Sequence, residues 1–216
     1  MNYKAVLFDF DYTLGDATEA IVAGFTYAFR EMGLPIPDRD SIRGTVGLML
    51  EDAYTLLSKD EVPARRAEFR RLFAQIGHPM QLEGVPLFPG AKELILALRD
   101  SGIPTGVISS KRTDALVSIL EKHGLARLMS LIIGGDKVDR PKPDPQGLLN
   151  ACSFLGLKPE EVLYCGDTVI DAETARRAGT CFCPVLNGVT PVDAFSSFPW
   201  EHIAPDLLEL RRWLEV

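Results

Sequence analysis

Two carboxylates one residue apart, Asp9 and Asp11, follow directly on the apolar run Ala5-Val6-Leu7-Phe8. A short run of this kind without a polar break is typical of a strand buried on both faces of a parallel sheet. Two acids at the end of such a strand repel each other and are costly to desolvate. A cation between them would relieve both costs. One acid could then act as a nucleophile and the other as a proton donor.

Polar residues follow other predicted strands as well. Ser109-Ser110-Lys111 comes after the predicted strand 103–108, and Gly166-Asp167-Thr168-Val169-Ile170-Asp171 follows the predicted strand 162–165. A lysine between two prolines, in Arg140-Pro141-Lys142-Pro143, lies on a stiff loop before a predicted helix. Ligands of parallel sheets bind beyond the carboxyl ends of the strands. These segments are therefore expected to meet at one edge of the sheet.

Several of these residues also have a purely structural explanation. Ser109 precedes a helix and could be its N-cap. Lys142 could be a solvated turn lysine, and Asp171 could complement the dipole of the helix that it begins. Asp167 comes directly after a buried strand, where no cap or dipole requires an acid, and this favours a metal ligand.

The four segments together resemble the four motifs of the haloacid dehalogenase-like phosphatase superfamily, in the branch of phosphoglycolate phosphatase and beta-phosphoglucomutase. The resemblance covers the whole predicted core and implies catalytic roles for Asp9, Asp11, Ser109 and Lys142. Asp9 would be the nucleophile that forms an aspartyl-phosphate, and Asp11 the general acid and base. Ser109 and Lys142 would stabilise charge on the phosphoryl group. The presence of Asp11 argues against the dehalogenase branch, whose halide leaving group needs no acid.

The resemblance also implies Mg²⁺, held by the Asp9 side chain, the Asp11 carbonyl and the Asp167 side chain, with Asp171 in support. Oxygen ligands without His or Cys suit this ion. Thr13 and Ser110 are predicted to bind substrate. Ser110 stands where related phosphatases often have Asn, so a role of that amide is absent or altered.

Residues 16–84 are predicted to be a helical cap, and residues 1–15 and 85–216 a Rossmann-like α/β core. The core alternates strands with helices, which predicts a mainly parallel sheet with helices on both faces. In the cap, a helix over residues 64–76 is expected to end at Gly77-His78-Pro79. The loop Arg43-Gly44-Thr45-Val46-Gly47 is the best candidate for contact with substrate, with Arg43 meeting an anion or lying on a solvated face. Tyr12, where the family usually has Gly, either lines the entrance to the site or packs as structure.

The composition excludes several classes of function. The chain has 216 residues, 46% of them hydrophobic and 25% charged, and a formal net charge of -7, which disfavours nucleic acid and anionic membranes as partners. No signal peptide or membrane span is expected. The four cysteines form no CxxC pair and are predicted to be free thiols in a reducing cytoplasm. A monomer or weak homodimer is expected.

The function predicted from these features is Mg²⁺-dependent hydrolysis of a small phosphorylated metabolite such as phosphoglycolate. A sugar phosphomutase or an inorganic pyrophosphatase is an alternative with the same motifs. A non-catalytic phosphate-binding module, such as a receiver domain, also clusters acids with a lysine. Receivers are shorter, however, and lack a helical insertion after the first acids.

Overall fold

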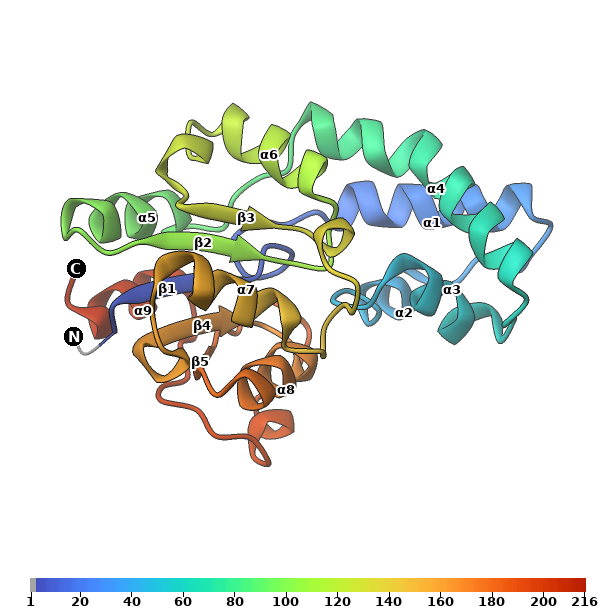
Figure 1. The fold of residues 1–216 in the computed structure, drawn as a ribbon. Helices are drawn as coiled ribbons and strands as arrows, with labels where there is room; N and C mark the ends of the chain where they lie inside the picture. Colours follow the sequence, from blue (N-terminus) through green and yellow to red (C-terminus); the bar gives the residue numbers. More distant parts are fainter. Residues whose placement is uncertain (1–2) are drawn as a thin grey trace.

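A parallel sheet in the order β3-β2-β1-β4-β5 forms the centre of the larger lobe (Figure 1). The computed structural model describes residues 3–216. The central strand β1 pairs with β2 on one side and with β4 on the other, with Phe8 beside Cys165. The strands are β1 (Ala5–Phe8), β2 (Thr105–Ile108), β3 (Leu131–Ile133), β4 (Val162–Gly166) and β5 (Cys181–Pro184). The predicted α/β fold is confirmed, and the register places the residues after β1 and β4 side by side.

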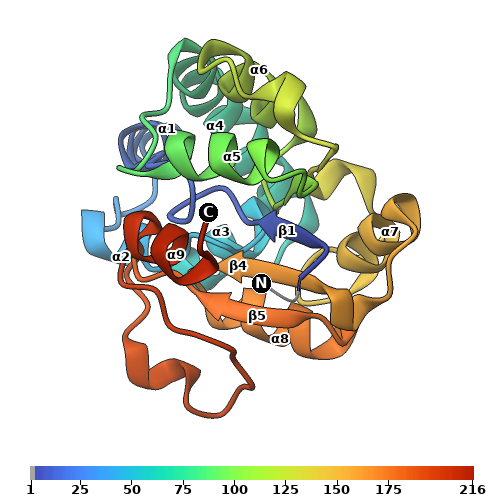
Figure 2. The same cartoon turned by 90° about the vertical axis from the view of Figure 1, so that its left-hand side faces the viewer.

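Helices cover both faces of the sheet (Figure 2). One face packs against α5 (Ala91–Asp100), α6 (Thr113–Lys122) and α9 (Leu207–Leu214). The other packs against α7 (Gln146–Leu155) and α8 (Val169–Ala178). Short 3₁₀ helices complete this lobe: η1 (Ala126–Leu128), η2 (Gly135–Lys137), η3 (Pro159–Glu161) and η4 (Val192–Phe195). No helix within residues 3–216 combines the length and apolarity needed to cross a membrane.

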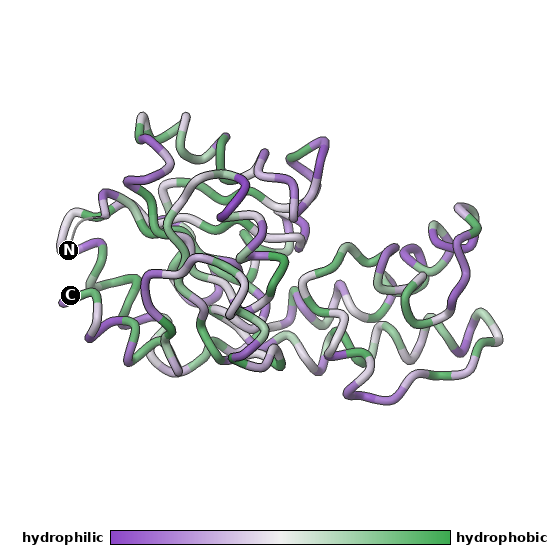
Figure 3. The backbone as a smooth tube through the Cα atoms, turned by 90° about the horizontal axis from the view of Figure 1, so that it is seen from below, coloured by the Kyte–Doolittle hydropathy of each residue, from purple (hydrophilic) through white to green (hydrophobic). Residues whose placement is uncertain are grey.

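A second, smaller lobe consists of helices (Figure 3). These are α1 (Thr18–Glu31), α2 (Arg39–Arg43), α3 (Leu50–Ser58) and α4 (Pro63–Glu83). They pack around aromatic rings, with the Phe25 and Phe69 centroids 4.9 Å apart and those of Tyr54 and Phe69 5.0 Å apart. Burial of such rings, which recur at helical spacing in α1 and α4, stabilises the lobe.

The chain passes between the lobes twice, and the two passages are hydrogen-bonded to each other. The Asp16 N–H donates to the Pro86 carbonyl at 2.9 Å, and the Phe88 N–H donates to the Leu14 carbonyl at 2.9 Å. An isolated bridge between Gly15 and Leu87 lies between these bonds. The two connections therefore form one short antiparallel ribbon.

The prediction that a helix ends at Gly77-His78-Pro79 is wrong, because α4 continues to Glu83. A Cβ on Gly77 would lie 2.7 Å from the Phe73 ring, and a Cβ on Gly24 of α1 would lie 2.6 Å from the same ring. Both glycines thus make room for Phe73 between the two helices. Pro79 is exposed to solvent. Packing of α4 against α1 outweighs the hydrogen bond that the proline removes.

Candidate active site

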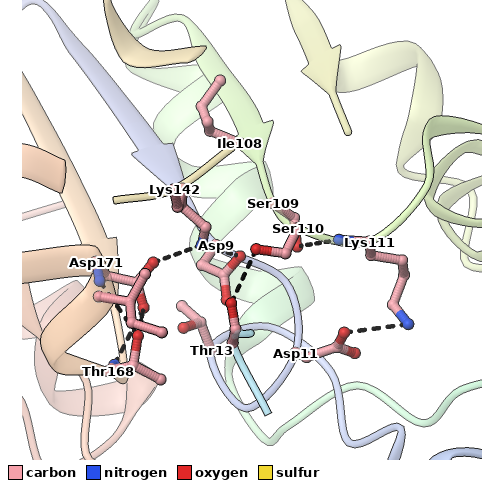
Figure 4. Close-up of polar contacts among 12 residues, drawn as sticks. Asp9, Asp11, Thr13, Ile108, Ser109, Ser110, Lys111, Lys142, Thr168 and Asp171 are labelled. Atoms are coloured by element: carbon pink, nitrogen blue, oxygen red, sulfur yellow. Dashed lines mark hydrogen bonds and ion pairs between the residues drawn. The ribbon is translucent and has the colours of Figure 1, made fainter. Parts of the chain in front are cut away.

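Asp9 follows β1 and is almost completely buried, with 2% of its surface exposed. Its N–H donates to the Cys165 carbonyl of β4 at 2.9 Å, which fixes the backbone where the chain leaves the sheet. Its Oδ1 accepts from Lys142 Nζ at 2.9 Å (Figure 4). Burial raises the pKa of Asp9 to about 6, although the Lys142 charge opposes that rise. A bound cation would favour the ionised form.

Lys142 lies on the loop before α7 and is the cation next to these acids. Its Nζ lies 2.6 Å from Asp171 Oδ1 and 2.9 Å from Asp9 Oδ1, and it donates to the Tyr164 hydroxyl at 3.2 Å. Burial by itself would lower the pKa of Lys142, but the Asp171 and Asp9 carboxylates raise it above its usual value. The lysine is therefore charged and is held by three partners.

Three carboxylates gather here that could hold a metal ion. Asp9, Asp167 and Asp171 each offer an oxygen, and these oxygens lie within 4.8 Å of one another. Asp171 is already bound, since its Oδ2 accepts from the Thr168 hydroxyl at 2.6 Å and its Oδ1 from Lys142. Burial, followed by the charges of Asp171 and Asp9, raises the pKa of Asp167 well above its usual value. When the three carboxyl groups are ionised, the single charge of Lys142 does not balance them, and the site is negative.

Asp167 has an oxygen to spare. Its Oδ1 accepts from the Thr13 hydroxyl at 3.4 Å, whereas its buried Oδ2 has no hydrogen-bond partner among the described residues. A Cβ on Gly188 would lie 2.1 Å from that Oδ2, so only glycine leaves the space beside it open. A buried carboxylate oxygen without a partner, among other hard oxygen donors, fits a Mg²⁺ ligand.

Asp11 lies at the other side of the site and pairs with Lys111, whose Nζ is 3.1 Å from Asp11 Oδ2 (Figure 4). The side chains of Lys111 and Asp11 are only 5% and 14% exposed. Asp11 Oδ1 is buried without a partner among the described residues. The Lys111 N–H donates to Ser109 Oγ at 3.3 Å. The segment after β2 therefore orients Asp11 through the Lys111 side chain and fixes the Ser109 hydroxyl through the Lys111 backbone.

A cavity of about 270 Å³ opens between the two lobes over these residues. Asp9, Asp11, Ser109 and Ser110 contribute to its wall from the sheet side, and α1, α3, α4 and the segment 45–49 contribute from the helical side. Ser110 Oγ donates to the Gly47 carbonyl at 2.9 Å, a bond between the lobes. The arrangement can enclose a phosphorylated compound with its phosphorus next to Asp9.

Arg43 and Thr13, two of the residues predicted to bind substrate, lie outside the cavity wall formed by the described residues. The Arg43 guanidinium lies 5.9 Å from the ring centroid of Tyr12 and pairs with Asp40 at 3.3 Å. Tyr12 is buried, and its hydroxyl lies 2.8 Å from Thr18 Oγ1, so this ring packs as structure. Thr13 is fully buried behind the site, where it contacts Asp167.

Sequence reasoning missed four residues that shape the site. Lys111 orients Asp11, and Tyr164 contacts Lys142. Asn187 Nδ2 donates to the Thr13 carbonyl at 3.1 Å. Its neighbour Gly188 is the fourth, since any larger residue there would clash with Asp167. The Asn-Gly pair at 187–188 signals only a turn. Lys111 could have been found, because it adjoins Ser109 in the second segment. The four cysteines are free as predicted, and all but Cys181 are buried.

Comparisons with known proteins agree with this architecture. The sequence matches the family described as haloacid dehalogenase-like hydrolase over residues 6–185. It is 37% identical over 198 residues to the N-acetylmuramic acid 6-phosphate phosphatase of Pseudomonas aeruginosa, covering 87% of this chain and 84% of that one. It is 31% identical over 204 residues to the phosphoglycolate phosphatase of Salmonella typhi, covering 85% and 80%.

Among solved structures, a haloacid dehalogenase-like hydrolase from Bacteroides fragilis superimposes with a TM-score of 0.93. The two are 35% identical, and the superposition covers 96% of this chain and 99% of that one. The match in sequence thus extends to the whole fold, including the helical lobe. This chain belongs to the haloacid dehalogenase-like hydrolase family.

Proposed function

We propose that this protein is a Mg²⁺-dependent phosphatase that hydrolyses a small phosphorylated metabolite through an aspartyl-phosphate. The observation that carries the proposal is the position of Asp9, which belongs both to the carboxylate cluster and to the cavity wall. In the proposed reaction, Asp9 has to contact both the Mg²⁺ ion and the phosphorus of the substrate. Residues 1–15 and 85–216 would be the catalytic core, and residues 16–84 the cap that encloses the substrate.

In the proposed reaction, an Asp9 oxygen attacks phosphorus in line while the bond to the leaving oxygen breaks. Asp11 gives a proton to that oxygen. Water then attacks the phosphorus of the aspartyl-phosphate, Asp11 accepts a proton from the water, and Asp9 and inorganic phosphate are released. Lys142 and the Ser109 hydroxyl would stabilise charge on the transferring group.

The Asp9 and Asp167 carboxylates and the Asp11 carbonyl would hold Mg²⁺, which when bound supplies positive charge to the phosphoryl oxygens. Asp171 would support the site without binding the ion, because Lys142 and Thr168 already occupy its two carboxylate oxygens. The Asp167 Oδ2, which has no partner among the described residues, supports this assignment.

Phosphatases acting on phosphoglycolate and on N-acetylmuramic acid 6-phosphate are among the relatives, which supports a small phosphomonoester as substrate. The free cysteines suit a reducing compartment, and we assign the protein to the cytoplasm. We expect a monomer or a weak homodimer, which light scattering would establish.

The proposal is tested by measuring phosphate release from a panel of phosphomonoesters, p-nitrophenyl phosphate included. Activity should require Mg²⁺, vanish in excess chelator and return when Mg²⁺ is restored. Asp9→Asn should abolish turnover while the protein stays folded, as checked by circular dichroism. Full activity in chelator, or in Asp9→Asn, would contradict the proposed site. Conversion of glucose 1-phosphate to an isomer without phosphate release would identify a mutase instead.

A further inference from the structure

One face of α4 lies over the cavity. Arg70, Ala74, His78 and Gln81 are spaced by four, four and three residues, so they share a side of the helix, and all four line the cavity wall. His78 and Gln81 reach this position only because α4 continues through Pro79 to Glu83. The helix thus extends two polar side chains over the place where the organic part of a substrate must lie.

Gln81 is a buried polar residue whose amide has no hydrogen-bond partner in the described part of the chain. Its side chain lines the cavity, and only 6% of the residue is exposed. Nearby hydrogen bonds run from Lys122 to the Glu83 carbonyl and between His123 and the Val85 carbonyl, and none among residues 3–216 involves the Gln81 amide. The amide is not among the solvent-inaccessible polar atoms that lack a partner, so in the free protein it faces the water of the cavity. A ligand group that enters the cavity can replace that water as its partner.

The cations of the cavity wall are, in contrast, already paired with carboxylates. Their charges are already balanced in part by these carboxylates, so an anionic group of a substrate would gain less from them than from an unpaired cation. The pairs are Lys111 with Asp11 at 3.1 Å, Arg70 with Glu51 at 3.2 Å and Arg112 with Asp114 at 3.1 Å. The neutral Gln81 amide, in contrast, has no protein partner within residues 3–216. An amide both donates and accepts, as hydroxyl and amide groups of a ligand do.

Apolar side chains complete the wall. Phe25 and Phe73 are nearly fully buried and, with Ile21 and Leu48, line the cavity on its helical side. Aromatic and aliphatic groups pack against C–H faces and exclude water from the polar contacts. A substrate that suits this wall has an apolar face as well as neutral polar groups.

We propose that His78 and Gln81 form the subsite for the organic part of the substrate, and that this part is a hydroxylated or acylamino ring, as in a sugar phosphate. The inference rests on the proposed phosphatase function and deepens it. Gln81 bonds a hydroxyl or amide of the ring, His78 one turn earlier on the helix reaches a neighbouring group, and the apolar wall packs against the C–H face. Phosphoglycolate, with a second charge and no ring, fits this subsite less well.

The test compares kcat/KM for glucose 6-phosphate and N-acetylglucosamine 6-phosphate with that for phosphoglycolate and for phenyl phosphate. The wild type should prefer at least one of the two sugar phosphates over phosphoglycolate. Gln81→Leu should lower kcat/KM for the preferred sugar phosphate by about 5- to 100-fold, as for a lost hydrogen bond with an unsatisfied partner. The same variant should change phenyl phosphate turnover by less than about 2-fold, since that substrate has no hydrogen-bonding group outside its phosphate ester.

Gln75→Leu is the matched control, because Gln75 lies exposed on the same helix and its Oε1 accepts from the Tyr27 hydroxyl at 2.8 Å. It should leave all four kcat/KM values unchanged. Gln81→Glu, which keeps the size of the side chain, shows whether any loss comes from shape or from the amide donors. A wild-type preference for phosphoglycolate, or an equal loss on all substrates in Gln81→Leu, would overturn this subsite but leave the phosphatase intact. Absence of turnover for every phosphomonoester would instead refute the function on which it rests.

Discussion

Substitution of Gly188 by alanine should disable the metal site without unfolding the protein. The added Cβ would lie 2.1 Å from Asp167 Oδ2 and 3.0 Å from its Cγ. Contacts between a Cβ and an oxygen shorter than 3.0 Å essentially do not occur, so the two groups must separate by about 1 Å. The carboxylate cannot easily yield, because Asp167 is 2% exposed and Thr13 bonds its other oxygen.

A displacement of about 1 Å at a catalytic group costs about 100-fold in rate. We therefore expect Gly188→Ala to lower kcat by about 100-fold and to weaken Mg²⁺ binding by about 10- to 100-fold, as measured by activity titration and by calorimetry. Overpacking should also cost about 1–3 kcal/mol of unfolding free energy, which leaves a domain of ordinary stability folded at 25 °C.

Gly102→Ala separates loss of stability from loss of the site. Gly102 has φ +72, and nothing lies within 4 Å of the position that an alanine methyl would take, so alanine there is strained but blocks no group. Its unfolding free energy should fall by about 1–2 kcal/mol with no change in kcat. Wild-type kcat and Mg²⁺ affinity in Gly188→Ala would refute the assignment of Asp167 Oδ2 to the cation.

Two further variants probe the proposed acid and the predicted substrate contact. Asp11→Asn should slow hydrolysis of alkyl phosphates far more than that of an aryl phosphate, whose phenol leaves without much help, and equal losses in kcat/KM would argue against Asp11 as the acid. Arg43→Ala should reduce unfolding free energy by about 0.5–1 kcal/mol through the lost contact with the Tyr12 ring, seen in urea titrations. It should leave the kcat/KM ratio of phosphoglycolate to p-nitrophenyl phosphate unchanged, and a selective loss on phosphoglycolate would return Arg43 to the substrate site.

The residues that follow strands could be predicted from sequence, because position in a parallel sheet and residue type together determine their surroundings. Asp9 and Asp167 follow adjacent strands, and the register of β1 against β4 brings them together. Lys142 stands out in the sequence through the prolines on either side of it. The convergence of these residues depends on the sheet alone, which alternating strand and helix patterns reveal.

The residues that complete the site depend on contacts between segments far apart in the chain. Gly188 is 21 residues from Asp167 and lies in a loop whose sequence indicates only a turn. Gln81 lies beyond the helix stop expected at Gly77, so the sequence pattern does not place it at the site. The local propensity of Gly77 and Pro79 does favour a helix end. The sequence pattern does not include the packing of the Phe73 ring between α4 and α1, and this packing keeps the helix intact beyond Gly77.

The paired connections between the lobes determine how the helical lobe can move. Two independent linkers would permit rotation about many axes, whereas the bonds from Asp16 to Pro86 and from Phe88 to Leu14 join them into one strip. Twisting the lobes against each other would break those bonds, but bending across the strip keeps them. We therefore expect the helical lobe to retain a single soft degree of freedom. After each opening that admits substrate, closure would bring α4 and Gln81 back along the same path. The enzyme would then re-form its binding site without sampling other orientations of the two lobes.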